Sequence, residues 1–216
     1  MNDWIAAEWP APGNIVAGTT LRTHDLSALP LPGEPCWLNQ VHGTDIVTSG
    51  RFDKPPEADG ATSGDSGHVC VVRTADCLPV LICSVEGSVF AAVHAGWRGL
   101  AAGVIENAIT KLDRDPTELL AWFGPAISQP CFEVGAEVRD AFLESDPDAA
   151  VCFVVNPGGR WQADLYALAR RRLNAVGVNN IYGGGLCTYL EDERFFSYRR
   201  DRACGRLVSF IGLKCP

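Results

Sequence analysis

One cysteine and two histidines stand in short loops beside strand-like runs, and their residue types could bind a metal ion. Cys77 follows the apolar run 69–73 in a Thr-Ala-Asp-Cys turn, and His94 ends the apolar run 89–94 before Ala-Gly-Trp-Arg-Gly. His42 lies upstream in Asn-Gln-Val-His-Gly. Thiolate and imidazole are preferred zinc ligands, and three protein ligands leave a fourth position open for an activated water. This residue set is the first candidate for a catalytic site.

Two other interpretations of the same residues stay open. The intervals from 42 to 77 and from 77 to 94 match no compact zinc motif, so spacing alone does not require a metal. Cys77 could instead be a nucleophile with His94 as its base, as in cysteine hydrolases, with a lesser role for His42. The three residues could also be core or surface histidines and a buried thiol without chemistry.

Arginines form a second group of candidates. Arg98 follows Gly96-Trp97 where a helix is expected to begin, and helix N–H groups with a guanidinium can bind an anion. Arg199 and Arg200 follow an aromatic stretch, although an Arg-Arg-Asp sequence is also typical of a solvated turn. Arg22 and Arg206 are weaker candidates.

Three acidic residues could transfer a proton or orient a histidine. They are Asp59 in a glycine-flanked turn, Asp76 beside Cys77, and Glu133. Because neighbouring side chains in an extended turn point in different directions, Asp76 could act on a histidine rather than with Cys77. Asp59 could be only a turn residue. The sequence does not choose between them.

Short apolar runs and helical stripes indicate an α+β protein with a mixed sheet, in a single domain over residues 1–216. Helices are predicted over residues 99–112, over 134–143, and from an N-cap at Asp164 to residue 176 with Gly177 after it. Residues 24–35 and 50–68 are predicted to be loops. Strands are predicted over residues 14–20, 36–41, 46–48, 69–73, 79–84, 89–94, 119–123, 151–155, around 181, 195–198 and 206–213.

Composition limits the classes of function. The chain has 216 residues, 47% of them apolar, and a formal charge of -8, which does not favour an extended nucleic-acid surface. Nine cysteines without a regular pattern, and no basic segment leading into an apolar core at the N-terminus, favour reduced thiols in the cytoplasm. No apolar run reaches the ~20 residues that span a membrane. The oligomeric state is not indicated.

Several motifs taken together resemble the YfiH-like family, also called laccase-domain or multicopper polyphenol oxidoreductase-type proteins and described as purine nucleoside phosphorylases. TADCLPV (74–80) and HAGWRG (94–99) are the most specific. The chain departs from the family pattern at residues 20–25, which lack the usual glycines. The other matching pieces are QVHG (40–43), ADG (58–60), GPAI (124–127), FEVG (132–135), CT (187–188), FSYRRD (196–201) and GR (205–206).

The resemblance implies an α/β/β/α sandwich related to cysteine hydrolases and a zinc site at His42, Cys77 and His94. It implies phosphorolysis of adenosine, inosine, guanosine and S-methyl-5′-thioadenosine, and hydrolytic deamination of adenosine. Nucleoside and phosphate are then the expected small-molecule partners. On this basis the expected catalytic residues are Cys77, His94, Asp76 and Arg98. The expected substrate-binding residues are Gln40, Asp59, Arg98, Arg199 and Arg200.

Two alternatives to a nucleoside phosphorylase remain open. The family is also linked to peptidoglycan-precursor editing, which would make the protein a Cys/His amide hydrolase. Its older name implies copper and polyphenol oxidation. A multicopper centre needs roughly ten imidazoles if its ligands follow the usual preference for histidine, and this chain has four histidines. Zinc is therefore preferred to copper. A zinc-binding interaction module is disfavoured, because structural zinc sites normally have four protein ligands.

Overall fold

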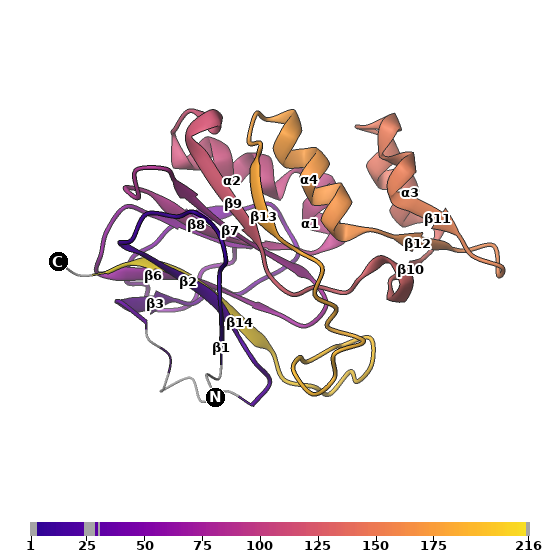
Figure 1. The fold of residues 1–216 in the computed structure, drawn as a ribbon, viewed down its shortest axis with the longest axis horizontal. Helices are drawn as coiled ribbons and strands as arrows, with labels where there is room; N and C mark the ends of the chain where they lie inside the picture. Colours follow the sequence, from indigo (N-terminus) through magenta and orange to yellow (C-terminus); the bar gives the residue numbers. More distant parts are fainter. Residues whose placement is uncertain (1–3, 24–28, 30, 215–216) are drawn as a thin grey trace.

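The computed structural model describes residues 4–23, 29 and 31–214, and these residues form two large mixed β-sheets with helices on one side (Figure 1). Both parallel and antiparallel pairs occur within each large sheet, as the sequence predicted. The six-stranded sheet contains, in spatial order, β13 (Asn180–Gly183), β9 (Leu119–Phe123), β7 (Leu78–Ser84), β8 (Phe90–Ala95), β5 (Gly60–Ser63) and β4 (Ile46–Thr48).

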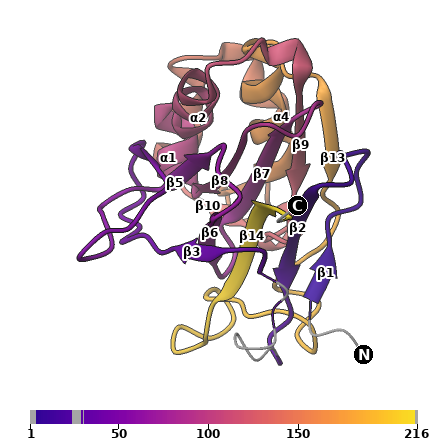
Figure 2. The same cartoon turned by 90° about the vertical axis from the view of Figure 1, so that its left-hand side faces the viewer.

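The second large sheet lies against the first, and a small third sheet projects at one end (Figures 1 and 2). The five-stranded sheet contains β1 (Trp4–Ala6), β2 (Ile15–Thr20), β14 (Leu207–Leu213), β6 (His68–Thr74) and β3 (Glu34–Cys36). The small sheet contains β10 (Glu133–Val134), β12 (Trp161–Ala163) and β11 (Phe153–Val155).

The four α-helices among the described residues are α1 (Trp97–Ala102), α2 (Val104–Leu112), α3 (Ala136–Leu143) and α4 (Leu165–Ala175). Helices α1, α2 and α4 cover the outer face of the six-stranded sheet, and α3 lies beside the small sheet (Figure 1). Short 3-10 helices are η2 (Pro116–Glu118), η3 (Gln129–Cys131) and η4 (Pro147–Cys152). Buried side chains from all four α-helices share one core with this sheet.

Alternation along the central strands explains why they read as continuous apolar runs. In β7, Val80 and Ile82 pack against the helices, whereas Leu81 and Cys83 pack between the two large sheets. A strand buried on both faces needs apolar residues at every position. The chain leaves β6 at Thr74 and enters β7, in the other large sheet, only four residues later. This crossover contains Cys77, which therefore lies at one end of the double layer.

The predicted α/β/β/α layering is wrong for the described residues, where the order is α/β/β. The outer face of the five-stranded sheet carries Val71 and Phe210, which are covered by Trp4, Trp37 and two leucines at 29 and 31. These N-terminal side chains bury the apolar face that a second helical layer would otherwise cover.

Most predicted strands are confirmed within a residue or two. The strand predicted over 36–41 is wrong: β3 ends at Cys36, and Asn39 makes only a single bridge with Glu57. The loop predicted over 50–68 contains β5, and part of the loop predicted over 24–35 lies outside the described residues. Strands β1, β10 and β12 were not predicted, since each has only two or three residues.

The strand predicted over 195–198 is wrong: residues 195–197 have no regular secondary structure and a turn begins at residue 198, although the burial of the side chains does alternate. Phe195 and Ser197 are fully buried, and this alternation of burial explains why the sequence resembles a strand. The guanidinium of Arg200 binds the Phe195 carbonyl at 2.7 Å, and Asp201 N–H binds the Ser197 carbonyl at 2.9 Å. A side chain and a tight turn therefore take the bonds that a neighbouring strand would make.

The helices predicted at 99–112 and 134–143 begin or break elsewhere. Gly103, at φ 99°, ends α1 and begins α2, because a left-handed residue cannot continue a helix. Val134 belongs to β10, and α3 starts at Ala136. The third helix is confirmed: the Asp164 side chain accepts a hydrogen bond from Ala167 N–H at 2.9 Å, and Gly177 follows at φ 93°.

We expect Asp164→Ala to lower the free energy of unfolding by about 1 kcal/mol, because the first turn of α4 would lose its side-chain acceptor. Asp164→Asn keeps an acceptor oxygen and should cost much less. Urea unfolding followed by circular dichroism measures both. Equal losses for the two variants would contradict the capping role.

Candidate metal centre

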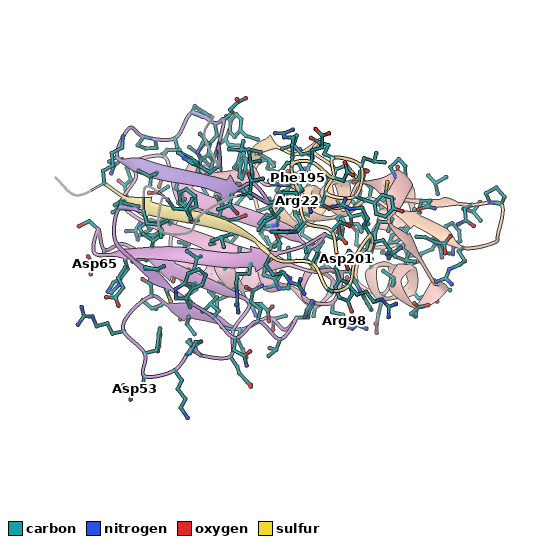
Figure 3. The ribbon with its side chains drawn as sticks, turned by 90° about the horizontal axis from the view of Figure 1, so that it is seen from below. Arg22, Asp53, Asp65, Arg98, Phe195 and Asp201 are labelled. Carbon is teal, nitrogen blue, oxygen red and sulfur yellow. The ribbon has the colours of Figure 1, made fainter. Side chains whose placement is uncertain are left out.

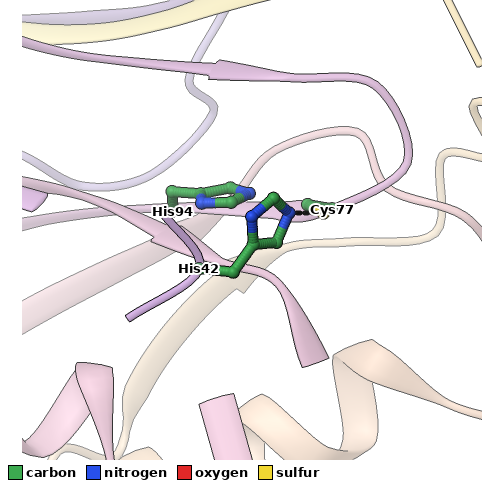
Figure 4. A group of neighbouring side chains, drawn as sticks. All are labelled: His42, Cys77 and His94. Carbon is green, nitrogen blue, oxygen red and sulfur yellow. Dashed lines mark hydrogen bonds between the residues drawn. The ribbon is translucent and has the colours of Figure 1, made fainter. Parts of the chain in front are cut away.

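His42, Cys77 and His94 meet at one end of the two large sheets (Figure 4). Their ligand atoms all lie within 4.8 Å of one another. The Cys77 Sγ is 4.0 Å from His42 Nε2, and the two imidazole rings stand edge to face with centroids 4.8 Å apart. Two loops and the end of strand β8, all distant in the sequence, thus bring one thiol and two imidazoles together.

Strand ends position two of the three candidate ligands, and a loop carries the third. His94 follows Phe90 and Ala92 on the face of β8 that points between the sheets, and only 3% of it is exposed. Cys77 lies in the crossover from β6 to β7. His42 comes from the loop between the Asn39 bridge and β4, and it is the most exposed of the three.

The carboxylate of Asp59, which is fully buried, joins two of the three ligand-bearing segments. One oxygen accepts hydrogen bonds from His94 Nδ1 at 2.7 Å and from the His42 N–H at 3.0 Å. The other accepts from the N–H groups of Val41 at 3.2 Å and Gly43 at 2.6 Å. Since the carboxylate only accepts, it fixes the proton of His94 on Nδ1 and leaves Nε2 free to bind a metal.

The loop that carries His42 is held in an unusual conformation. His42 has φ 61°, in the left-handed region that side chains other than glycine rarely occupy. The bonds from 41–43 to Asp59 hold this turn. Gly99 of α1 also permits it, because a Cβ at that position would lie 2.6 Å from the Gly43 carbonyl oxygen.

Gly96 leaves the space in which the three ligands face one another. A Cβ on Gly96 would lie 3.0 Å from His42 Cδ2, 3.2 Å from Cys77 Sγ and 3.5 Å from His94 Cε1. Its φ of -64° is available to any residue, so space and not backbone freedom requires glycine here. Because residue 96 has no side chain, the backbone of the turn after β8 can lie directly against the triad.

The electrostatics of the triad favour a thiolate. Burial alone would raise the pKa of Cys77, but hydrogen bonds and charge from His42 and His94 lower it to about 6. Burial would lower the pKa of His94, but the bonds to Asp59 and Cys77 raise it to about 9. Burial opposes ionisation of Asp59 as well, yet the bonds from His94 and Gly43 leave its pKa below the ordinary value.

The donor set fits zinc. Zinc binds thiolate sulfur at about 2.3 Å and imidazole nitrogen at about 2.0 Å, so donors this close need only a small movement to share one ion. The carboxylate behind His94 is the partner that metal-bound imidazoles usually have. Two of the donors, Cys77 and His94, also form a Cys-His-Asp series with Asp59, which is the arrangement of a cysteine hydrolase.

A pocket of about 750 Å³ opens above the triad. This size is ordinary for a small-molecule site. It is lined by Asn39, Gln40, His42, Arg73, Thr74, Ala75, Cys77, His94, Tyr198, Cys204 and Arg206.

Two predicted site residues hold backbone around this pocket. Gln40 lines it, but its amide is paired with the main chain of Arg73, donating at 2.9 Å and accepting at 2.8 Å. Asp76 has φ 87°, and its carboxylate accepts hydrogen bonds from Thr188 Oγ1 at 2.6 Å and from the Arg199 N–H at 2.7 Å. Asp76 therefore fixes the turn before Cys77 to the C-terminal segment.

Three of the predicted arginines, Arg98, Arg199 and Arg200, lie outside the pocket lining. Arg98 is exposed, with its guanidinium 4.3 Å from the Trp97 ring centroid (Figure 3). The guanidinium of Arg199 donates twice to the Glu133 carbonyl at 3.1 Å. Arg200 donates to the carbonyls of Thr188, Tyr189 and Phe195. The substrate contacts expected of these arginines remain predictions, and their observed contacts are within the protein.

Arg22 and Glu133 are also bound elsewhere. The Arg22 N–H donates to the Arg194 carbonyl at 2.8 Å, and its guanidinium lies over the Phe196 ring, beside the segment that contains Phe195 (Figure 3). The Glu133 carboxylate accepts from Asn156 and pairs with Arg160. Neither lines the pocket above the triad.

The sequence did not single out six of the lining residues: Asn39, Arg73, Thr74, Ala75, Tyr198 and Cys204. Arg73 and Thr74 are the last residues of β6, so the rule that strand ends carry functional groups could have found them. Tyr198 was read as part of a strand, and its exposure follows from the turn that begins at this residue. Arg206, a weak candidate from the sequence, does line the pocket.

The fold and the open three-donor pocket are those of a laccase-type domain. A family described as "Multi-copper polyphenol oxidoreductase laccase" matches residues 19–214, and the chain belongs to this family. The resemblance drawn from the motifs is therefore confirmed.

Similar proteins carry phosphorylase names. The chain is 43% identical to "Purine nucleoside phosphorylase YfiH" of Shigella flexneri, over 99% of this chain and all of that protein. It is 42% identical to the Escherichia coli protein of the same name, with the same coverage. A solved structure of the Neisseria meningitidis protein NMB0706 superposes with a TM-score of 0.94 at 40% identity, over 99% of this chain and 100% of that one.

Among the described residues, every helix is too short or too polar to cross a membrane.

We expect Asp59→Asn to lower zinc affinity about ten- to hundredfold, because the amide would turn a donor toward one of the groups that now donate to the carboxylate. Asp45→Asn is a matched control, since that exposed acid lies in the neighbouring loop and outside the pocket lining. Competition with a chromogenic chelator measures the affinity. An unchanged affinity in Asp59→Asn would show that the carboxylate does not orient His94.

Cys77 of the metal-free protein should react with iodoacetamide down to unusually low pH. Because its pKa is lowered to about 6, the thiolate is present above that pH and is lost below it. Peptide mass spectrometry after short labelling gives the pH of half-maximal rate. A midpoint near the ordinary 9 would contradict the thiolate, and zinc should suppress labelling until a chelator is added.

Proposed function

We propose that the protein is a zinc-dependent purine nucleoside phosphorylase acting on adenosine, inosine, guanosine and S-methyl-5′-thioadenosine. The observation that carries this proposal is the open three-donor centre at the base of a nucleoside-sized pocket. The names of the relatives support phosphorolysis as the reaction class. Small molecules are then the partners, and we retain the prediction of a cytoplasmic location.

The residues of the chain prepare the centre for this chemistry. When bound there, zinc would act as a Lewis acid or lower the pKa of a water molecule. Asp59 keeps the His94 proton on Nδ1, which directs the Nε2 lone pair at the ion. The same carboxylate holds the turn of His42, and Cys77 supplies the anionic ligand. Gly96 leaves the three donors free to face one another.

Protonation of the leaving base requires an acid, and none of the three carboxylates considered lines the pocket. Asp59 is behind His94, Asp76 is bound to Thr188 and Arg199, and Glu133 is paired outside. We therefore assign the proton to pocket water or to the hydroxyl of Tyr198, which does line the pocket.

Deamination of adenosine is part of the proposal as a second reaction of the same pocket. Water would add at C6 of the purine, and ammonia would leave, giving inosine. Polarisation of water at the metal position is the chemistry that this reaction needs. The absence of acidic residues from the described pocket lining again leaves water or Tyr198 as proton carriers.

A Cys/His amide hydrolase, of the kind used in peptidoglycan-precursor editing, is the second candidate. The bond of 2.7 Å between His94 Nδ1 and Asp59 favours it, because a base oriented by an acid is the usual partner of a cysteine nucleophile. His42 separates the two candidates, since a hydrolase has no need of a second imidazole 4.0 Å from its nucleophile. Polyphenol oxidation by a multicopper centre is not favoured with four histidines.

His42→Ala should abolish both zinc binding and phosphate-dependent release of base from adenosine, because only two protein donors would remain. His68→Ala is the matched control: that histidine lies at the start of β6, near Asp65 and outside the pocket lining. Metal analysis and chromatography of free base are the measurements. Full zinc content and phosphorolysis in His42→Ala would exclude the proposed three-ligand centre, and loss of zinc with phosphate-independent cleavage of an amide by Cys77 would favour the hydrolase.

A further inference from the structure

The pocket above the metal centre is positively charged although the protein is acidic. Arg206 and Arg73 are among its lining residues, and the described part of the lining contains no aspartate or glutamate. The Arg73 guanidinium donates to the Leu38 carbonyl at 3.2 Å and lies over the Trp37 ring, so Arg206 is the arginine with donors for a ligand. The whole chain carries a formal charge of -8. A lining of one sign raises the local concentration of ions of the opposite sign. The charge of the pocket therefore favours an anionic ligand.

The hydroxyl of Thr74 is the second observation. Only 1% of Thr74 is exposed, it lines the pocket, and its Oγ1 has no hydrogen-bond partner among the described residues. Buried hydroxyl groups are nearly always paired, because an unpaired one loses its bonds to water without replacement. A ligand oxygen in the pocket would supply the missing partner.

Thr74 faces the metal centre from the opposite sheet. Along β6, Cys70 and Val72 alternate with residues of the outer face and pack between the sheets, and Thr74 continues that row. His94 continues the corresponding row of β8. The threonine hydroxyl and the His94 imidazole thus belong to facing rows at the same end of the double layer.

Arg206 stands beside Thr74 and has donors to spare. Thr74 pairs with Leu207 in the register of β6 and β14, so Arg206 is the next residue along the chain from that pair. Its hydrogen bonds to described residues run through Nη1, to the carbonyls of Cys204 and Gly205. The guanidinium lies 5.7 Å from the Tyr198 ring centroid, and Nε and Nη2 remain available for an oxyanion.

We propose that Thr74 Oγ1 and the Arg206 guanidinium form an oxyanion subsite that binds inorganic phosphate next to the metal centre. The inference rests on the proposed function, which requires phosphate beside the nucleoside. In the reaction a phosphate oxygen forms a bond to C1′ as the C1′–N9 bond breaks. The base leaves with the electron pair and takes a proton from water or Tyr198.

This subsite differs from the one that the sequence suggested. The helix that begins near Arg98 has only six residues, and Arg98 stacks on Trp97 outside the pocket. The guanidinium of Arg200 is bound to three carbonyls. The tetrahedral anion is therefore assigned to the side of the pocket formed by the β6 and β14 ends.

The experiment measures binding of inorganic phosphate to zinc-loaded full-length protein by isothermal titration, beside the kinetics of adenosine phosphorolysis. Arg206→Gln should weaken phosphate binding about ten- to hundredfold, because a charged bidentate donor is lost. Thr74→Val should weaken it about five- to tenfold. The KM for phosphate should rise in parallel, while zinc content and the KM for adenosine change by less than about twofold.

Two matched variants guard against an effect of folding or of net charge. Arg202→Gln removes an exposed arginine that lies four residues before Arg206 and does not line the pocket. This variant should leave phosphate binding unchanged. Thr74→Ser restores the hydroxyl at the buried position and should bind phosphate within about twofold of the parent protein. Equal weakening in Thr74→Ser and Thr74→Val would overturn the role of the hydroxyl.

The outcomes separate the subsite from the proposed function. If phosphorolysis proceeds and substitution of Arg206 and Thr74 changes neither the affinity nor the KM for phosphate, the subsite alone is overturned. A parent protein that catalyses phosphorolysis but shows no phosphate binding would also overturn it. Phosphate binding that depends on both residues, without phosphorolysis, would support the subsite and reject the function. Adenosine 5′-monophosphate is the second probe: if it binds more tightly than phosphate through Arg206, the assignment to free phosphate is overturned.

Discussion

The carboxylate of Asp59 is the constraint on which the site depends. It is fully buried and accepts four hydrogen bonds, three from the backbone turn of His42 and one from the ring of His94. A buried charge is stable only when its oxygens are paired, so each of these bonds also stabilises the folded protein. Positioning of the candidate metal ligands and burial of the charge therefore depend on the same hydrogen bonds.

A second carboxylate does the corresponding work for the cysteine. Asp76 has φ 87°, a conformation that costs free energy in a residue with a side chain, and its two oxygens bind Thr188 and the Arg199 N–H. These bonds fasten the C-terminal segment, which carries Tyr198 and Arg206, over the turn of Cys77. The strained turns at His42 and Asp76 are thus each held by a buried acid, and both lie at the pocket.

Much of the fold could be predicted from sequence because strands buried on both faces read as unbroken apolar runs, as β7 and β9 do. The three metal-ligating candidates could be found because chemistry-bearing residue types stand at strand ends. The roles of Asp59 and Gln40 could not be separated from substrate binding, since their partners come from distant segments. The contacts of the Arg200 guanidinium with three carbonyls could not be predicted from a local pattern either, and its expected role in substrate binding stays a prediction.

The geometry around the three side chains supports the proposed metal centre over a cysteine hydrolase without a metal. A Cys-His-Asp series by itself needs neither the imidazole of His42 nor an empty space against all three side chains, and this protein has both. The left-handed conformation of His42 costs free energy. Gly96 and Gly99 are each required because a side chain there would come too close to neighbouring atoms. Such a turn persists when the surrounding structure determines it. Here the surroundings place a third donor opposite the other two, under a pocket whose described lining carries arginines and no acid.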